Sequence, residues 1–257
     1  MTELKVAIIG CGPSGMVIAH ACDQMGVPFT IYAPKDKSHI SGAQYLHSDI
    51  GVRQEGLYPR TVTYCKRGNE WTYEGKIYPN GLPKGMKSSW DKFSDSVDAW
   101  PLIGIYDYLW ERHHDQIVDS EVALEFIMAL GETCLTFNTA PLNKLMPKAH
   151  FEYETVMICD GVTFAPEDTI VYNGELHSPW YRSSNLWGHY SVEFPVDAYY
   201  RAKMPLIQYE PRRIRKPLLT DAVIPGVIAS GRYGRWEKGV LVDESYHQAI
   251  AEIKARL

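Results

Sequence analysis

Residues 10–15 read Gly-Cys-Gly-Pro-Ser-Gly, a G-x-G-x-x-G pattern whose residue types suit the binding of a phosphate group. The first glycine permits a tight turn, the second lets the backbone approach a pyrophosphate, and the third lets the next helix pack closely on the preceding strand. The N-terminus of that helix adds free N–H groups and the positive end of its dipole. We therefore expect a dinucleotide diphosphate to be held by Gly10, Gly12, Pro13, Ser14 and Gly15.

The neighbouring residues provide the elements that such a turn needs. Residues 4–9 form an apolar, β-branched run that is typical of a strand buried on both faces of a parallel sheet. Apolar residues at helical spacing follow over residues 16–25, and Gly26 suits the end of that helix. Residues 29–32 indicate a second strand. Strand, glycine turn, helix and strand in this order predict one right-handed βαβ unit.

One expected residue is missing at the end of the second strand. Dinucleotide-binding βαβ units carry an acidic residue there, which holds the adenosine ribose, but this chain has Ala33. Either Asp36 or the hydroxyl of Ser38 replaces the acid, or Lys35 and Lys37 face a phosphate as in NADP sites. The residues themselves leave FAD and NADP as alternatives, and we expect Ala33 and Lys35 to lie against the bound dinucleotide.

The rest of the chain contains helical segments and long aromatic-rich segments. We expect helices at residues 105–114, 121–130 and 244–257, the second ending at Gly131, and buried strands at 134–138 and 223–229. Residues 48–112 and 155–200 carry many aromatic side chains and alternating stretches such as 61–64 and 71–73, which favour β-strands.

These segments predict an α/β fold of two parts. The first is a Rossmann-like FAD/NAD(P)-binding domain with a parallel sheet core, made of residues 1–48, 113–160 and 219–257. The second is a trimmed antiparallel β-rich substrate region, inserted as residues 49–112 and 161–218.

Four segments are similar, in order along the chain, to the flavoprotein superfamily of UDP-galactopyranose mutases, protoporphyrinogen oxidases and amine oxidases. They are the βαβ unit at 6–15, the glycine-containing segment 40–47, the strand-turn-helix 135–145 and the Gly-Arg-Tyr-Gly-Arg-Trp turn at 231–236. A fifth match, at 171–184, resembles a tyrosine-glycine and Tyr-Arg-Ser segment of the mutases. The compact length resembles small FAD-dependent oxidoreductase-like proteins of bacteriophages.

The resemblance implies FAD as the cofactor, with the chemistry carried by its isoalloxazine. It implies that the backbone of Val118 contacts the adenine. The residues implied beside the ribityl chain and the flavin are Ser41, Gly42, Ala43 and Gln44. Those implied at the pyrimidine end of the flavin are Gly231, Arg232, Leu241 and Val242. A structural ion pair is the alternative role for the arginine.

Three side chains are candidates for catalysis. His47 follows the second glycine segment, and an imidazole that titrates near neutral pH can act as an acid or a base, although a core or loop histidine is the alternative. Tyr181 and Arg182 either line a substrate pocket or pack at a strand end. The basic run at 212–216 is either a solvated loop or a contact for an anionic substrate, such as a nucleotide or a nucleotide derivative.

Composition excludes several other classes of protein. The net charge of −5, with 22% charged and 45% hydrophobic residues, indicates a globular protein with no stable nucleic-acid binding. Five scattered cysteines, an odd number without a C-x-x-C pair, favour neither disulfides nor zinc and fit a cytoplasmic protein. We expect no metal site, because the side chains of His113, His114 and Asp115 diverge on a solvated helix face. No signal peptide or membrane span is expected, and the oligomeric state stays open.

Three functions therefore remain. The first is an FAD-dependent oxidoreductase, or a flavin-using mutase or lyase, acting on a small polar substrate; a role in phage nucleobase modification follows from the resemblance alone. The second is an NAD(P)-dependent oxidoreductase, favoured by Lys35 and Lys37. The third is a non-catalytic dinucleotide-binding protein.

Overall fold

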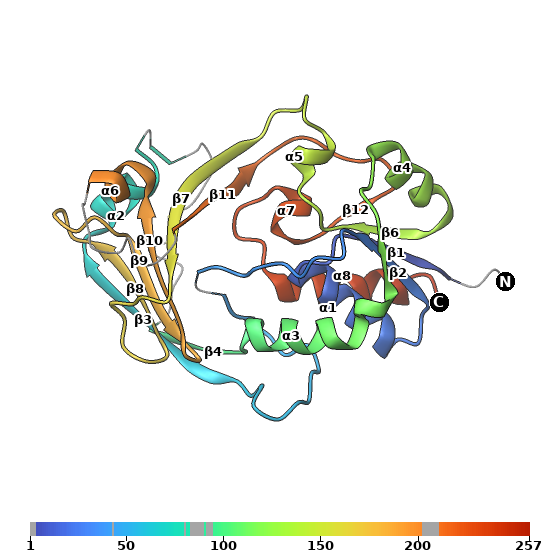
Figure 1. Ribbon diagram of the computed structural model, residues 1–257, viewed down its shortest axis with the longest axis horizontal. Coiled ribbons are helices and arrows are strands. Elements are labelled where there is room, and N and C mark those ends of the chain that lie inside the picture. The colour runs from blue at the N-terminus through green and yellow to red at the C-terminus, as the bar shows by residue number, and fades with distance from the viewer. Residues whose placement is uncertain (1–3, 43, 80, 83–89, 91–94, 202–210) are drawn as a thin grey trace.

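The computed structural model of the chain describes residues 4–42, 44–79, 81–82, 90, 95–201 and 211–257. Two β-sheets organise these residues, one of five strands in the order β12-β6-β1-β2-β5 and one of seven in the order β11-β7-β10-β9-β8-β3-β4. Figure 1 shows the two sheets at opposite ends of the molecule, the five-stranded sheet with its helices on the right. Each sheet contains strands from distant parts of the chain, so the chain crosses between the two ends several times.

The five-stranded sheet is parallel. Its strands are β1 (Val6–Ile9), β2 (Phe29–Ala33), β5 (Ile117–Asp119), β6 (Leu135–Asn138) and β12 (Ile228–Ala229). β1 lies in the middle, with Val6 in register with Phe29 of β2 on one side and with Leu135 of β6 on the other. All four residues of β1 are buried, as expected for a parallel strand with helices on both faces of its sheet.

Helices cover both faces of this sheet (Figure 1). On one face lie α1 (Pro13–Gln24), α3 (Leu102–His113) and α8 (Val242–Lys254), and α1 contacts both α3 and α8. On the other lie α4 (Leu124–Thr133), α5 (Leu142–Leu145) and α7 (Gly231–Arg235). A short 3-10 turn, His114–Gln116, joins α3 to β5. The apolar residues between helices and sheet form a separate core on each face.

The seven-stranded sheet is antiparallel except for one pair. Its strands are β3 (Arg60–Gly68), β4 (Ser96–Ala99), β7 (Glu152–Asp160), β8 (Thr169–Gly174), β9 (Arg182–Leu186), β10 (His189–Pro195) and β11 (Arg212–Leu219). The parallel pair is β3 and β8. Helix α2 (Glu70–Ile77) packs against β8, and α6 (Val196–Arg201) packs against β7 and β10.

The expected fold class is confirmed: a Rossmann-like parallel sheet accompanies a largely antiparallel, β-rich sheet. The expected boundaries differ in two places. Residues 152–160, assigned to the dinucleotide-binding part, form β7, which pairs with β10 and β11 of the second sheet. Residues 102–112, assigned to the inserted part, belong to α3, which packs on α1 because its buried face is apolar. The division into domains otherwise stays a prediction.

Several local expectations are wrong. Residues 71–73 lie in α2 rather than a strand, because Asn69 caps the helix by accepting a hydrogen bond from the N–H of Thr72 at 2.8 Å. Helix α4 continues past Gly131, where the absence of a side chain lets the carbonyl of Gly226 approach. The late strand covers only residues 228–229.

Two further segments differ from the expectation. The basic run at 212–216 lies in the strand β11 rather than in a loop, because pairing with β7 satisfies its backbone, while Arg212, Arg213 and Arg215 are exposed as a solvated segment would be. His113 is buried where α3 packs against the sheet, rather than exposed on a solvated helix face.

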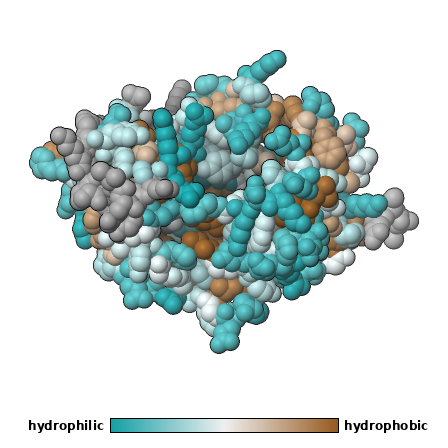
Figure 2. Space-filling model, viewed as in Figure 1, coloured by the Kyte–Doolittle hydropathy of each residue, from teal (hydrophilic) through white to brown (hydrophobic). Residues whose placement is uncertain are grey.

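The molecular surface in Figure 2 is mostly hydrophilic, and apolar residues reach this face in small groups. Within the part of the chain that the structure describes, no helix combines the length and the apolar character that crossing a membrane requires.

Candidate functional site

The glycine turn after β1 has the geometry that its pattern predicts. Gly10 has a φ of +99°, a value that favours glycine. A Cβ on Gly15 would lie 2.0 Å from the carbonyl oxygen of Gly10, so glycine is required for α1 to begin this close to β1. Gly12 is the N-cap residue of α1 and contributes no side-chain cap. The first N–H groups of α1 are therefore available to an anion.

A second glycine turn, at the start of α7, lies against the first. A Cβ on Gly231 would lie 2.3 Å from Oγ of Ser14, on the first turn of α1. A Cβ on Gly234 would lie 2.1 Å from the carbonyl oxygen of Asn138, the last residue of β6. Both glycines thus allow backbone contacts that a larger residue would block. The two glycine turns that the sequence singles out meet at one helix end.

The end of β2 has an acidic neighbour that sequence reasoning missed. Ala33 is in register with Asp119 of β5, and Oδ1 of Asp119 accepts a hydrogen bond from the N–H of Lys35 at 3.2 Å. The acid therefore lies beside the end of β2 but comes from the next strand. In the sequence, Asp119 could have been found only because it directly follows Val118, the residue expected at the adenine. In the structure Val118 is 47% exposed.

The residues that the sequence offers in place of the acid have different surroundings. Lys37 forms an ion pair with Asp107 of α3, with 2.8 Å between Nζ and Oδ1. Ser38 lies near the glycine turn, since its Oγ would be 3.7 Å from a Cβ on Gly12. Its backbone N–H donates to the hydroxyl of Tyr106 at 3.0 Å. Of these two side chains, Ser38 is the one placed beside the diphosphate turn.

The segment 41–44 contacts the second sheet. Gly42, with a φ of +83°, donates from its N–H to Oδ1 of Asp160 at 3.2 Å. A Cβ on Gly42 would lie 3.0 Å from Oε1 of Glu193, so glycine keeps the backbone close to that carboxylate. The hydroxyl of Ser41 is buried and finds no hydrogen-bond partner among the described residues. Gln44 donates from Nε2 to the carbonyl of Ser41 at 3.2 Å, and Ala43 lies outside the described residues.

His47 lies at the N-terminus of α8. Its N–H donates to Oδ1 of Asp243 at 3.3 Å, just after Leu241, the N-cap residue, and Val242, the first helical residue. Burial lowers the pKa of the His47 imidazole, and the negative charge of Asp243 opposes that shift. Its Nδ1 is buried and unpartnered among the described residues. The structure therefore brings together segment 40–47 and the N-terminus of α8, both of which the resemblance places around the flavin.

Glu193 is the centre of a buried charge cluster in the second sheet. Its carboxylate accepts hydrogen bonds from the Tyr181 hydroxyl, at 2.6 Å, and from Nε of Arg182, at 2.8 Å. Nη2 of Arg182 and Nζ of Lys216 also pair with it. Burial alone would raise the pKa of Glu193, but the two cations bring it to about 2. Glu193 is thus ionised, and Tyr181 and Arg182 are anchored to it.

Two further charged residues extend this cluster towards α7. Glu154 is in register with Lys216, and burial raises its pKa while Lys216 lowers it. The pKa of Arg232, the second residue of α7, also depends on this cluster. Burial and the charge of Arg182 lower this pKa, and the charge of Glu154 raises it. The charges of this cluster therefore act on Arg232, which follows Gly231 in the turn that contacts Ser14.

Tyrosines connect the cluster with His47. The ring of Tyr45 lies 4.6 Å from the ring of His47, and its hydroxyl is 2.5 Å from that of Tyr64. Tyr64 lies 6.2 Å from Tyr172, which hydrogen-bonds with Arg182. The three candidate catalytic residues therefore border one continuous group of polar and aromatic side chains.

Several solved structures have a fold similar to that of this chain. The chain superimposes on a reduced UDP-galactopyranose mutase with a TM-score of 0.55 and 11% identity, over 99% of this chain and 96% of that one. A tryptophan 6-halogenase from Streptomyces toxytricini matches with a TM-score of 0.63 and 14% identity, over 100% and 73%. A flavoprotein/dehydrogenase from Cytophaga hutchinsonii matches with a TM-score of 0.56 and 12% identity, over 98% and 79%.

This chain has the fold of these solved structures. The resemblance to UDP-galactopyranose mutases that the sequence motifs indicate is thereby confirmed at the level of the fold. No family model matches the sequence, and no curated protein matches it.

Replacement of Glu193 by Gln is expected to lower the free energy of unfolding by about 3–5 kcal/mol, because Arg182 and Lys216 would stay buried without a counter-charge. Tyr181→Phe is the comparison variant: it removes the hydrogen bond to the same carboxylate and the one from Lys216 but leaves the charges paired, so it should cost less, about 1.5–3 kcal/mol. Urea denaturation of both variants measures the difference. A Glu193→Gln protein as stable as the wild type would contradict the central place of this carboxylate.

Acid titration tests the same group through its pKa. Since the folded-state pKa of Glu193 is about 2, below the ordinary value of 4.5, its ionisation stabilises the fold above pH 4.5. That contribution is lost as the pH falls from 4.5 towards 2. The unfolding free energy of Glu193→Gln should therefore fall less steeply with pH over this range than that of the wild type.

Proposed function

We propose that this chain is an FAD-dependent enzyme that holds the FAD diphosphate at the N-terminus of α1. The observation that carries the proposal is the contact between Gly231 and Ser14, because it joins both glycine turns at one uncapped helix end. A pyrophosphate needs close backbone approach and free N–H groups, and Gly12 leaves room for it. The flavoprotein fold supports FAD as the dinucleotide.

The chain offers groups of the right kind along the length of such a cofactor. The buried hydroxyl of Ser41 and the buried Nδ1 of His47 lack partners among the described residues, and a polar cofactor would satisfy them. Gly42 follows Ser41 directly, and the N-terminus of α8, at Leu241 and Val242, lies beside His47. Bound FAD would supply hydride or electron transfer. The helix N-terminus would favour negative charge near it.

Asp119 is proposed to take the role of the acid that is missing at Ala33. Its carboxylate lies at the carboxyl end of β5, in register with Ala33, where the adenosine ribose of a dinucleotide is held in this kind of fold. A carboxylate at that place favours a free ribose hydroxyl and disfavours a 2′-phosphate, because like charges repel. This argues for FAD over NADP, in spite of the neighbouring Lys35.

The substrate is proposed to be a small anion, for which a nucleotide derivative is one candidate. Three cations, Arg182, Lys216 and Arg232, face two carboxylates in the buried cluster, and burial raises the pKa of one of these, Glu154. The remaining positive charge favours a carboxylate or phosphate group. Burial lowers the pKa of His47 and so favours its neutral imidazole, which can accept a proton from a group bound beside it.

The first test of cofactor binding uses Gly12. Its φ of −70° suits any residue, and a Cβ would meet only Oγ of Ser38 at 3.7 Å, so Gly12→Ala should fold normally. The added methyl group would nevertheless occupy the approach of the diphosphate. We expect wild-type protein to bind one FAD with a visible flavin band, and Gly12→Ala to bind FAD at least about tenfold more weakly, which is about 1.4 kcal/mol.

Gly75→Ala is the matched control, because Gly75 lies in helix α2 and, among the described residues, no atom outside its chain neighbours and its own helix backbone lies within 4 Å of its Cβ position. It should bind FAD as the wild type does. Fluorescence quenching of FAD gives the three affinities, and circular dichroism checks the fold. A protein that gains no flavin band with FAD, or a Gly12→Ala variant with unchanged affinity, would contradict the proposal.

A second test concerns the ribose. Asp119→Asn should weaken FAD binding by about tenfold, since a charged hydrogen bond contributes roughly 1.5–3 kcal/mol. Asp36→Asn, in the loop after β2, should leave the affinity unchanged. The opposite pattern, with the loss at Asp36, would assign the ribose to the loop and remove Asp119 from the site.

A further inference from the structure

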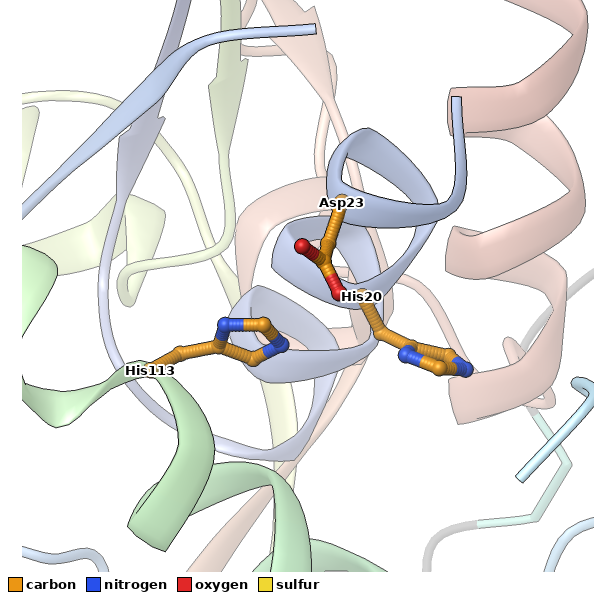
Figure 3. Close-up of side chains that lie close together, drawn as sticks. All are labelled: His20, Asp23 and His113. Carbon is orange, nitrogen blue, oxygen red and sulfur yellow. The ribbon is translucent and has the colours of Figure 1, made fainter. Parts of the chain in front are cut away.

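Three side chains that can bind a metal meet on the helix-covered face of the parallel sheet, at the end of α1 away from the glycine turn. His20 and Asp23 lie three residues apart on one face of α1, and His113 is the last residue of α3. Their candidate ligand atoms all lie within 4.8 Å of one another. Figure 3 shows the two imidazoles facing each other, with the Asp23 carboxylate beside them.

Both histidines have a buried ring nitrogen without a hydrogen-bond partner among the described residues. His20 is 6% exposed and His113 is 2% exposed. Nδ1 of His20 and Nε2 of His113 have no hydrogen-bond partner among the described residues. Buried polar atoms are nearly always paired, so two unpaired nitrogens in one cluster require an explanation. A metal ion that takes both lone pairs provides one.

The other sides of the two rings carry the contacts that metal-binding histidines usually have. Nε2 of His20 lies 3.2 Å from the carbonyl oxygen of Ile50, which can only accept, so this hydrogen bond places the proton on Nε2 and leaves the Nδ1 lone pair free. The amide nitrogen of Gln24 lies 3.0 Å from the same Nε2 and favours the opposite tautomer. A metal ion bound to Nδ1 would select the tautomer that has its proton on Nε2. The side chain of Gln116 hydrogen-bonds with His113.

Asp23 offers a carboxylate that is only partly used. Nε and Nη2 of Arg112 approach Oδ2 at 3.0 and 2.6 Å, so Oδ1 is not part of this ion pair. The side chain is exposed beside an open depression of about 460 Å³, which Gln116 and Phe29 also line. Solvent and ions therefore reach the Asp23 carboxylate, one of the three candidate ligands.

We propose that His20, Asp23 and His113 bind a divalent transition-metal ion of the zinc type. Two imidazoles and one carboxylate are a common zinc ligand set, with a water in the fourth position. Ligand atoms about 2.0–2.1 Å from a tetrahedral zinc lie about 3.3–3.4 Å apart, so a pair separated by as much as 4.8 Å would approach by roughly 1.5 Å. The ion would join α1 to α3. Sequence spacing could not reveal the site, because His113 comes from a distant helix.

Equilibrium dialysis of the full chain against ZnCl₂, with elemental analysis, tests this site. We expect one zinc per chain and a rise in Tm with zinc concentration. Asp23→Asn should weaken binding by at least about tenfold, a loss of the order seen when metal-site residues are changed. Arg112→Gln should strengthen binding, because it frees the carboxylate and removes a nearby positive charge.

His114→Gln is the control, since His114 is adjacent in sequence but outside the cluster, and it should bind zinc as the wild type does. Asp23, Arg112 and His114 lie at or near the surface, so the three variants should fold, and circular dichroism checks this. Absence of stoichiometric zinc, or equal zinc affinity in the wild type and Asp23→Asn, would overturn the proposal. A loss with His114→Gln instead would also overturn it.

Discussion

The uncapped N-terminus of α1 is the constraint on which the proposed site depends. Gly12 supplies no side chain to the helix end, and Gly15 lets the helix start against the carbonyl of Gly10. Gly231 then brings α7 into contact with Ser14. Each of these approaches is closer than a Cβ would permit, so the glycines fix how the first and last elements of the parallel sheet meet. An anion is the natural partner for the N–H groups left there.

Charge orders the side chains of the second sheet that lie close to Gly42. Glu193 neutralises Arg182 and Lys216 inside the sheet, and its carboxylate stands close to the backbone of Gly42. Because buried cations need a counter-charge, the cluster fixes the side chains that border the proposed cofactor region. Arg232 and Glu154 carry the same network to α7. Stability and substrate binding would thus depend on the same residues.

Sequence patterns predict the parts of this structure that local chemistry determines. The βαβ unit and its glycine turn follow from residues 4–32, because strand, turn and helix signals coincide there. Pairings between distant segments are not encoded locally, so sequence patterns assign β7 to the wrong sheet and leave the basic strand β11 open to interpretation as a loop. Asp119 was missed for the same reason, since its role depends on a neighbouring strand. His20 and His113 meet only through helix packing.

A crystal structure of the protein grown with FAD would test the central claim most directly. The account predicts that the diphosphate lies at the N-terminus of α1, against the backbone at Gly12 and Ser14, with the ribose beside Asp119 and the flavin towards Gly42 and α8. FAD bound at another place, or a diphosphate with no contact to the α1 N-terminus, would contradict it.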